Sequence, residues 1–241
     1  MSKDNRGEEM SNIAIITARG GSKRIPRKNI KPFLGKPIMI YSIEAALQSG
    51  VFDEVMVSTD DEEIAEIAQK AGASVPFMRS EATSNDYATT CDVLLEVLSE
   101  YEKLGKTFDY MACLYPTNPF ITAEKLRTSI ELIENNDYAE IVPIVQFSFP
   151  PQRSYVLNED GSLVYKWPEF ANSRSQDLEK MYHDAGQFYV YDVNKYIANR
   201  GPKGTIFPLV CPDSEVQDID TLEDWKMAEL KVEFMRRSQK N

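Results

Sequence analysis

Short apolar runs alternate with amphipathic helical patterns over the first 146 residues, and this alternation restricts the fold more than any other feature. The run NIAIITA at 12–18 has the unbroken apolar character of a buried strand. Similar runs follow at DEVMVST, SVPFM, DYMACLYPTNPF and YAEIVPIVQF, with helical patterns between them. This spacing is typical of β-α-β units. We therefore predict an α/β fold with a mostly parallel central sheet that is covered on both faces.

The predicted helices carry their own start and stop signals. The segment KPIMIYSIEAALQSG ends at Gly50 and places four apolar residues on one stripe: Ile40, Ile43, Ala46 and Leu47. The next helix begins after Asp60 or Asp61, and Gly72 terminates it. Thr122 is expected to cap a later helix. The helix between these two covers 88–104 and is expected to bury Val93, Leu94, Val97, Leu98 and Tyr101.

The regular alternation stops near Ser148. From there to about Asp184 the chain is richer in Pro, Asn, Ser and Arg, and NEDGS between SYVL and LVYKW predicts a hairpin turn. We interpret 146–183 as an arm inserted into a single domain, 12–241. The core then resumes with the strands AGQFYVYD and GTIFPLV and a closing helix, DIDTLEDWKMAELKVEFM. Residues 1–11 are polar and are predicted to be a disordered tail.

A cluster of cations follows the first predicted strand of this acidic chain. The formal net charge is −11 at pH 7, which argues against a general nucleic-acid-binding surface. Yet the stretch ARGGSKRIPRKN at 18–29 contains Arg19, Lys23, Arg24, Arg27 and Lys28. Ligands of open α/β sheets bind beyond the carboxyl ends of the strands, so this position favours a small polyanion over solvated surface charge. Gly20 and Gly21 let the backbone approach a phosphate, and Ser22 offers a hydroxyl.

Several other classes of protein are disfavoured. The cation-rich stretch contains neither GxxxxGK[ST] nor GxGxxG, which argues against P-loop kinases and dinucleotide-dependent dehydrogenases. The three cysteines have no paired spacing and the chain has one histidine, which argues against a disulfide framework or a zinc site. No signal peptide and no membrane-spanning apolar stretch is recognised. We therefore predict a cytoplasmic protein that binds neither nucleic acid nor membranes.

The stretch AIITARGGSKRIPRKNIKPFLGKP resembles the activating loop of the cytidylyltransferases that act on sialic acid and its relatives. Three further stretches resemble the same family, so that the resemblance extends over about 12–232: FDEVMVSTDDEEIAEIAQKAGASVPFMRSE, LYPTNPF and DSEVQDIDTLEDW. It implies a Rossmann-like fold of the nucleotide-diphosphosugar transferase kind and a homodimer whose inserted arm reaches over the partner's active site. It also implies that CTP and a nine-carbon 2-keto sugar acid react to give a CMP-sugar and pyrophosphate.

Within this family, RSQDLEKMYHDAGQFYV resembles the branch that activates pseudaminic acid. Sialic- and legionaminic-type members more usually read NGAIY where this chain has AGQFY at 185–189. The expected sugar is therefore pseudaminic acid, and N-acetylneuraminic or legionaminic acid is the alternative. A shorter 3-deoxy sugar is less favoured, because that branch usually reads closer to ARYxSTRLPGKPL. A non-catalytic nucleotide-binding protein is the alternative from another class, but it would not need Arg19, Lys28, Asp218 and Asp220 together.

The resemblance also assigns roles to individual residues. Arg19 and Lys28 are expected to be the catalytic cations that hold the triphosphate. Contacts to the nucleotide are expected from Ala18, Gly20, Ser22, Asn29, Arg79, Ala88 and Thr90. Contacts to the sugar are expected from Tyr115, Arg174, His183, Gln187 and Phe188. Tyr115 departs from the glutamine of several relatives, His183 either acts as a base or makes a structural hydrogen bond, and Asp86 either caps a helix or orients its loop.

Asp218 and Asp220 stand two residues apart in QDID. Residues two apart on an extended segment point to the same side, so both carboxylates can face one cation. Oxygen ligands beside a phosphate substrate indicate Mg²⁺, with Mn²⁺ as a possible substitute. The alternative role for Asp220 is to cap the helix that begins at TLEDW.

Overall fold

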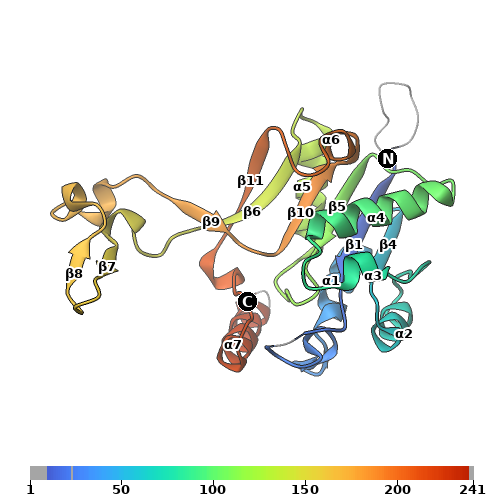
Figure 1. Ribbon diagram of the computed structural model, residues 1–241, viewed down its shortest axis with the longest axis horizontal. Coiled ribbons are helices and arrows are strands. Elements are labelled where there is room, and N and C mark those ends of the chain that lie inside the picture. Colours follow the sequence, from blue (N-terminus) through green and yellow to red (C-terminus); the bar gives the residue numbers. More distant parts are fainter. Residues whose placement is uncertain (1–9, 23, 239–241) are drawn as a thin grey trace.

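The computed structural model describes residues 10–22 and 24–238, and its centre is one mixed β-sheet (Figure 1). The strand order is β11 (Ile206–Cys211), β6 (Glu140–Gln146), β10 (Phe188–Asp192), β5 (Tyr110–Leu114), β1 (Asn12–Thr17) and β4 (Glu54–Ser58), and β9 (Tyr182–Asp184) also pairs with β6. β1 lies parallel to β4 and β5, and β11 lies parallel to β6. β10 is antiparallel to both of its neighbours.

The predicted α/β fold with a mostly parallel central sheet is confirmed, since β1, β4, β5, β6 and β11 all run in one direction, but β9 and β10 run in the opposite one. The reason lies in the inserted segment. The chain leaves the sheet at the carboxyl end of β6 and returns at the same edge through β9, which is antiparallel to β6. The next core strand, β10, must therefore run back across the sheet in the opposite direction.

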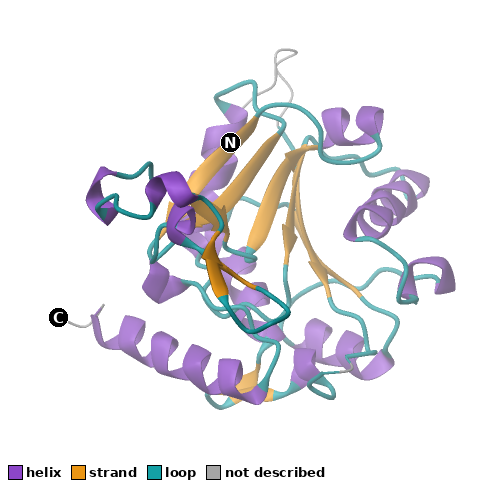
Figure 2. Ribbon diagram, turned by 60° about the vertical axis from the view of Figure 1, so that its left-hand side comes forward, coloured by secondary structure: helices purple, strands orange, loops and turns teal. Residues whose placement is uncertain are grey.

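Helices cover both faces of the sheet (Figure 2). On one face, α1 (Met39–Ser49), α2 (Glu62–Lys70) and α5 (Ala123–Glu134) bury side chains against Ala14 and Ile16 of β1. On the other face, α4 (Thr90–Lys103) and α6 (Val193–Asn199) pack against Ile13 and Ile15. Because alternate residues of a strand point to opposite faces, one unbroken apolar run supplies both interfaces. Within the described ranges, no helix has the length and apolar character needed to cross a membrane.

Most predicted helix signals are confirmed. The Asp61 carboxylate accepts a hydrogen bond from the Ile64 N–H (3.0 Å), and the Thr122 hydroxyl accepts one from Lys125 (3.2 Å). Gly50 ends α1 in the left-handed conformation. The five apolar residues predicted to be inward on α4 are all buried. The stripe on α1 is shifted, because Met39 is buried and Leu47 is 42% exposed.

The predicted strand SVPFM, 74–78, is wrong. Only Ser74 pairs with the sheet, as an isolated bridge to Met56. Pro76 lacks an N–H donor, so the ladder cannot continue beyond this point. β4 is therefore an edge strand of the sheet.

A third hydrophobic cluster joins residues from the N-terminal part of the chain to residues from the C-terminal part. Ile25 and Phe33 pack with Ile219, Trp225 and Val232, of which the last two belong to α7 (Leu222–Ser238). A small hairpin, β2 (Pro32–Phe33) and β3 (Lys36–Pro37), carries Phe33 into this cluster. The remaining short helices are α3 (Glu81–Ser84) and 3-10 turns at Lys28–Ile30 and Asp213–Glu215. This packing brings the cation-rich stretch next to the two aspartates of QDID.

Residues 147–181, called the arm below, project from the sheet between β6 and β9 (Figure 1). The predicted hairpin is formed by β7 (Tyr155–Leu157) and β8 (Leu163–Tyr165), which are antiparallel. Three short 3-10 turns complete the arm: Pro151–Arg153, Pro168–Phe170 and Ser175–Asp177. Large apolar side chains are exposed on it, with Phe149 at 85% and Leu157 at 69%.

Candidate active site

A cleft of about 400 Å³ opens at the carboxyl end of β1. It is lined by Thr17, Arg19, Ser22, Arg24, Lys28, Asn29 and Thr117. Five of these seven residues belong to the cation-rich stretch 18–29, called the cation loop below. Thr17 ends β1, and Thr117 follows β5, the strand beside it. The cleft therefore lies where ligands of open α/β sheets bind.

Contacts from the neighbouring elements fix the backbone of the cation loop. The Gly20 N–H donates to the Asp60 carboxylate (2.8 Å), and a Cβ at Gly20 would lie 2.7 Å from Asp61 Oδ2. Glycine is therefore the residue that fits this position. Asn29 Nδ2 donates to the carbonyl of Arg19 (2.8 Å), so the buried Asn29 supports the loop while it also lines the cleft.

Arg27 has a structural role. Its guanidinium pairs with Asp61 and Glu63 at the start of α2, and it does not line the cleft. The hydrogen bond with Asp61 is the main cause of a raised pKa for Arg27. The backbone of Arg27 has a positive φ of 55°, just ahead of the turn at Lys28–Ile30. Arg27 is thus neither a free surface cation nor directed at a ligand, and Lys23 lies outside the described residues.

Arg24 and Lys28 both meet Asp220. Arg24 forms an ion pair with its carboxylate, while Lys28 Nζ lies 3.8 Å from Oδ1 and donates to the carbonyl of Ile219 (2.6 Å). The Lys28 side chain is only 17% exposed. Burial lowers the pKa of Lys28, and the nearby charges of Asp220 and Asp218 oppose this shift. The two cations and the paired aspartates therefore form one compact charged group beside the cleft.

Asp218 and Asp220 flank the buried Ile219, as expected for an extended segment whose alternate residues share a side. The alternative role of Asp220 as a helix cap is wrong. The Asp224 carboxylate accepts hydrogen bonds from the N–H groups of Thr221 (2.8 Å) and Asp220 (3.1 Å), and the Thr221 hydroxyl accepts one from Asp224 (3.2 Å). Thr221 and Asp224 thus cap α7, and the Asp220 carboxylate, which pairs with Arg24, takes no part in the cap.

Arg79, Ala88 and Thr90 lie on the segment that follows β4. Arg79 donates to the Ser58 hydroxyl (3.0 Å) and carbonyl (2.6 Å), and burial lowers the pKa of its guanidinium. The Ala88 N–H donates to Asn85 Oδ1 (3.0 Å), and Thr90 is the first residue of α4. Arg19 reaches this segment directly, because its guanidinium donates to Asp86 Oδ1 (3.1 Å). Asp86 is therefore not a helix cap, since Thr89 and Asp92 cap α4.

Two tyrosines lie side by side at the carboxyl end of β5. The rings of Tyr115 and Tyr189 are 5.6 Å apart and meet edge to face at 72°. The Tyr189 hydroxyl donates to Asp184 (2.6 Å), and the Tyr115 N–H donates to the carbonyl of Gln187 (3.0 Å). Burial raises the pKa of Tyr115 and, more strongly, that of Tyr189. Neutral aromatic rings therefore form the surface at this end of the sheet.

Two of the residues predicted to contact the sugar are in the interior. Phe188 is fully buried in the core cluster with Ala112 and Leu114. Gln187 is also fully buried, and its side chain donates to the carbonyl of Glu215 (2.6 Å) and accepts from Lys125 (3.3 Å). Neither side chain offers a surface to a ligand, so the prediction that the side chains of Gln187 and Phe188 contact the sugar is wrong.

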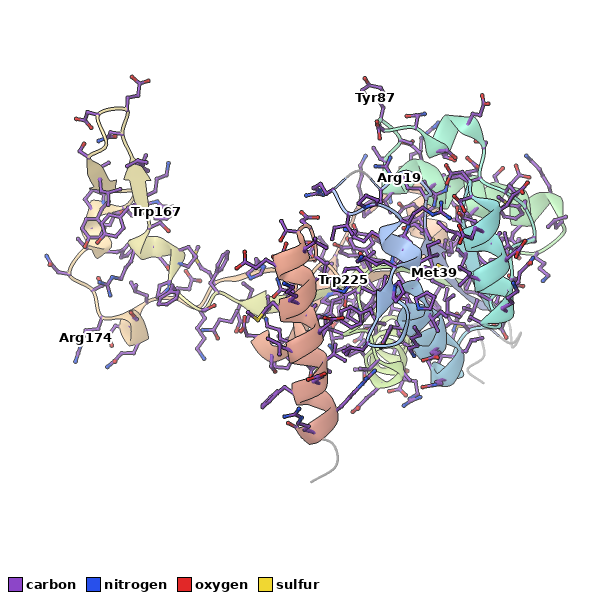
Figure 3. All side chains as sticks on the ribbon, turned by 90° about the horizontal axis from the view of Figure 1, so that it is seen from below. Arg19, Met39, Tyr87, Trp167, Arg174 and Trp225 are labelled. Carbon is purple, nitrogen blue, oxygen red and sulfur yellow. The ribbon has the colours of Figure 1, made fainter. Side chains whose placement is uncertain are left out.

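The other two residues lie towards the arm. His183 on β9 is exposed, shares a hydrogen bond with the carbonyl of Asp184 (2.9 Å) and packs against Phe147, with ring centroids 4.7 Å apart. Arg174 lies within the arm and pairs with Asp177 (3.0 Å). Figure 3 shows Arg174 on the projecting arm and Arg19 in the main body of the molecule. One chain alone therefore does not bring Arg174 to the cleft.

The family model for cytidylyltransferases matches residues 13–194, which is more than half of the chain. The chain belongs to the cytidylyltransferase family. It is 42% identical to a pseudaminic acid cytidylyltransferase of Campylobacter jejuni, over 92% of this chain and 96% of that protein. It is 34% identical to a CMP-N,N'-diacetyllegionaminic acid synthase of Legionella pneumophila, over 92% and 96% of the two chains.

A solved structure of a CMP:2-keto-3-deoxy-manno-octonic acid synthetase, complexed with CTP, has the same fold. Its TM-score is 0.66 at 20% identity, and the match covers 94% of this chain and 99% of that one. The resemblance that the cation loop indicated is thus confirmed at the level of family and fold. As a cytidylyltransferase, the chain is an enzyme that transfers a cytidylyl group.

Thr17, Thr117, Tyr189 and Asp184 are candidate site residues of this cytidylyltransferase that the sequence prediction missed. Thr117 carried a usable signal, because the turn PTNP follows a strand adjacent to β1. Tyr189 carried another, because it shares a strand face with Tyr191 and not with Phe188. Nothing in the local sequence indicated that Asp184 would accept the hydroxyl of Tyr189.

Proposed function

We propose that this cytidylyltransferase joins the α-phosphate of CTP to the anomeric hydroxyl of pseudaminic acid and releases pyrophosphate. The observation that carries the proposal is the cleft lined by Arg19, Ser22, Lys28 and Asn29, in a chain 42% identical to a pseudaminic acid cytidylyltransferase. N-acetylneuraminic and legionaminic acids are the alternative sugars, since a legionaminic acid synthase is also similar to the chain. We place the reaction in the cytoplasm.

The cation loop would hold the triphosphate and stabilise the transition state. The sugar hydroxyl loses its proton and forms a bond to the α-phosphorus, while the bond to the bridging β-phosphate oxygen breaks and pyrophosphate leaves with the electron pair. Arg19 and Lys28 line the same cleft and would neutralise the charge that develops on the leaving group. Ala18, Gly20, Ser22 and Asn29 place backbone and polar groups beside them.

The segment that follows β4 is proposed to recognise the cytosine. Arg79 is held by Ser58, Ala88 lies on the turn that Asn85 organises, and Thr90 begins α4. These three residues lie beyond the carboxyl end of the strand adjacent to β1, and the ion pair between Arg19 and Asp86 ties their segment to the cation loop. The phosphate and base ends of CTP would therefore occupy neighbouring parts of one site.

Enzymes of this family typically need a divalent metal ion, and we propose that Asp218 and Asp220 bind Mg²⁺ here, with Mn²⁺ as a substitute. The donor set fits, because both groups are carboxylates and neither is needed to cap α7. Among the described residues no larger cluster of His, Cys, Asp or Glu could hold a metal ion. The ion would supply positive charge to the phosphates, whose oxygens and water would complete its coordination.

The metal assignment is tested by Mg²⁺ titration of pyrophosphate release. Asp220→Asn should raise the Mg²⁺ concentration for half-maximal rate by about tenfold or more, because one of two carboxylate ligands is lost. Asp213→Asn, an exposed aspartate on the preceding 3-10 turn, is the matched control. An unchanged Mg²⁺ requirement in Asp220→Asn would contradict the assignment.

The sugar end is proposed to be completed in a homodimer. Tyr115 would contact the sugar from within the chain, while Arg174 from the partner's arm would bind its carboxylate with a bidentate guanidinium. The exposed apolar surface of the arm supports association. His183, at the base of the arm, would lie near the sugar. Its Nδ1 contacts the Asp184 carbonyl, so Nε2 is the ring nitrogen that would face the sugar.

The decisive experiment measures pyrophosphate release from CTP and Mg²⁺ with pseudaminic, legionaminic and N-acetylneuraminic acids side by side. We expect the highest kcat/KM with pseudaminic acid. A clear preference for N-acetylneuraminic acid would contradict the sugar assignment but not the reaction. If none of the three sugars released pyrophosphate while CTP still bound, the chain would be a nucleotide-binding protein.

A further inference from the structure

The cations of the cation loop have carboxylate partners of different kinds. Arg27 is fixed to α2 by two acids, and Arg24 and Lys28 meet the proposed metal ligand Asp220. Arg19 differs from them. Its partner Asp86 belongs neither to the sheet nor to the proposed metal site, but to the turn between α3 and α4.

The turn holds Asp86 close to the cleft. Asn85 Oδ1 accepts hydrogen bonds from the N–H groups of Tyr87 (2.8 Å) and Ala88 (3.0 Å), and Asn85 Nδ2 donates to the carbonyl of Ala82 (2.8 Å). Arg19 Nη1 lies 3.1 Å from Asp86 Oδ1 and 3.5 Å from the Asn85 carbonyl. The Asp86 carboxylate therefore already occupies one hydrogen-bond donor of the Arg19 guanidinium, which lines the cleft.

The pair is exposed enough to separate easily. The Arg19 side chain is 41% exposed and that of Asp86 is 50% exposed, so solvent screens their attraction. A triphosphate or pyrophosphate carries several negative charges and can replace the single carboxylate. When pyrophosphate dissociates, Asp86 is again within reach of Arg19.

We propose that Asp86 competes with the phosphates for Arg19 and thereby limits the affinity of the enzyme for pyrophosphate. This inference rests on the proposed function, since it assumes that Arg19 binds the triphosphate. Asp86 is a positioning residue that acts through Arg19 and does not contact the reacting atoms. In the absence of nucleotide it keeps the guanidinium in place, and after transfer it favours release of the product.

Competition and a purely structural role of Asp86 predict opposite changes in the affinity for phosphate ligands. If Asp86 only supported Arg19, its loss would weaken the binding of phosphate ligands. If Asp86 competes, its loss strengthens their binding. The sign of the change in affinity therefore separates the two roles.

The test is calorimetric titration of inorganic pyrophosphate into the full-length enzyme with Mg²⁺. We expect Asp86→Asn to lower the Kd for pyrophosphate about three- to fivefold, the range that one exposed ion pair allows. The inhibition constant of pyrophosphate in the forward reaction should fall by the same factor. Both differences should shrink as the salt concentration rises, because exposed charges are screened.

Two variants serve as controls. Asp86→Glu keeps the charge and should restore a Kd within about twofold of the wild type. Asp137→Asn removes one exposed carboxylate that pairs with Lys195 near the amino end of β6, and it should leave the Kd unchanged. A lower Kd in Asp137→Asn as well would assign the effect to net charge and overturn the proposal.

An unchanged or higher Kd for pyrophosphate in Asp86→Asn would also overturn it. If the wild type turns over CTP normally and only this comparison fails, the proposed function stands. If the wild type neither binds pyrophosphate nor releases it from CTP, the proposed function fails and this inference fails with it.

Discussion

The proposed nucleotide end of the site and the arm differ in how their residues are packed. The cation loop and the two aspartates share a buried hydrophobic cluster through Ile25, Ile219 and Trp225. The arm has no such cluster, and of its residues only Gln152 is buried. Its contacts are local, such as the hydrogen bond between the Tyr155 and Tyr165 hydroxyls (2.8 Å). Thus one chain packs the proposed nucleotide end against a buried cluster, whereas the arm leaves its large apolar side chains exposed.

The strongest test of this difference removes two cations of the cation loop, at the proposed nucleotide end. We expect Arg19→Ala and Lys28→Ala each to lower turnover roughly 10²–10³-fold, about 3–4 kcal/mol of transition-state stabilisation. The measurement is pyrophosphate release at saturating CTP. Lys70→Ala, which removes an exposed cation on α2, should keep wild-type turnover. Near-normal turnover in both cleft variants would remove them from the catalytic machinery.

A matched pair of valines tests the difference in packing. Val97 on α4 is 1% exposed and Val164 on the arm is 48% exposed. Val97→Ala should lower the free energy of unfolding by about 2–3 kcal/mol through lost burial and a cavity, while Val164→Ala should change it by less than about 0.5 kcal/mol. Urea denaturation at low protein concentration measures both. Equal losses would mean that the arm is packed like the core.

Arg174 tests whether two chains share the sugar end. Arg174→Ala should raise the KM for the sugar acid about 10–100-fold, the effect of losing a charged hydrogen bond, and leave the KM for CTP unchanged. A sharper form mixes Arg19→Ala and Arg174→Ala chains. In a random 1:1 mixture of dimers, about a quarter of the sites would contain neither change, and activity should recover to that level. No recovery after subunit exchange would place both residues of each site in one chain.

The smallest expected effect concerns the choice of sugar. Tyr115→Gln replaces an aromatic edge with an amide that can hydrogen-bond a polar sugar chain. We expect the ratio of kcat/KM for N-acetylneuraminic acid to that for pseudaminic acid to rise about three- to tenfold. Tyr115→Phe, which keeps the ring, should leave this ratio close to that of the wild type. An unchanged ratio in Tyr115→Gln would mean that the ring does not face the sugar.

The sequence predicted the core elements well because their signals are local. Apolar runs, the cap at Asp61 and Gly50 each act within a few residues, and the structure contains them as expected. No local signal predicts the direction of β10, because this direction depends on where the arm returns to the sheet. The stretch AGQFY predicted a core strand correctly, but Phe188 faces α1 and α5 while Tyr189 faces Tyr115. A residue pattern that marks a branch of a family does not say which side of a strand faces the ligand.

The hydrophobic cluster that contains both Ile25 and Ile219 has a consequence for protein synthesis. Arg24 and Asp220, which form an ion pair, are separated by 196 positions in the chain. During translation the sheet strands emerge before Asp220 does, so a chain still attached to the ribosome can acquire most of its core without its charged centre. The hydrophobic cluster around Ile25 can form only after Ile219 and Trp225 have been synthesised. Chains that end prematurely would therefore lack the proposed metal carboxylates, and competence to bind CTP would appear only when synthesis is almost complete.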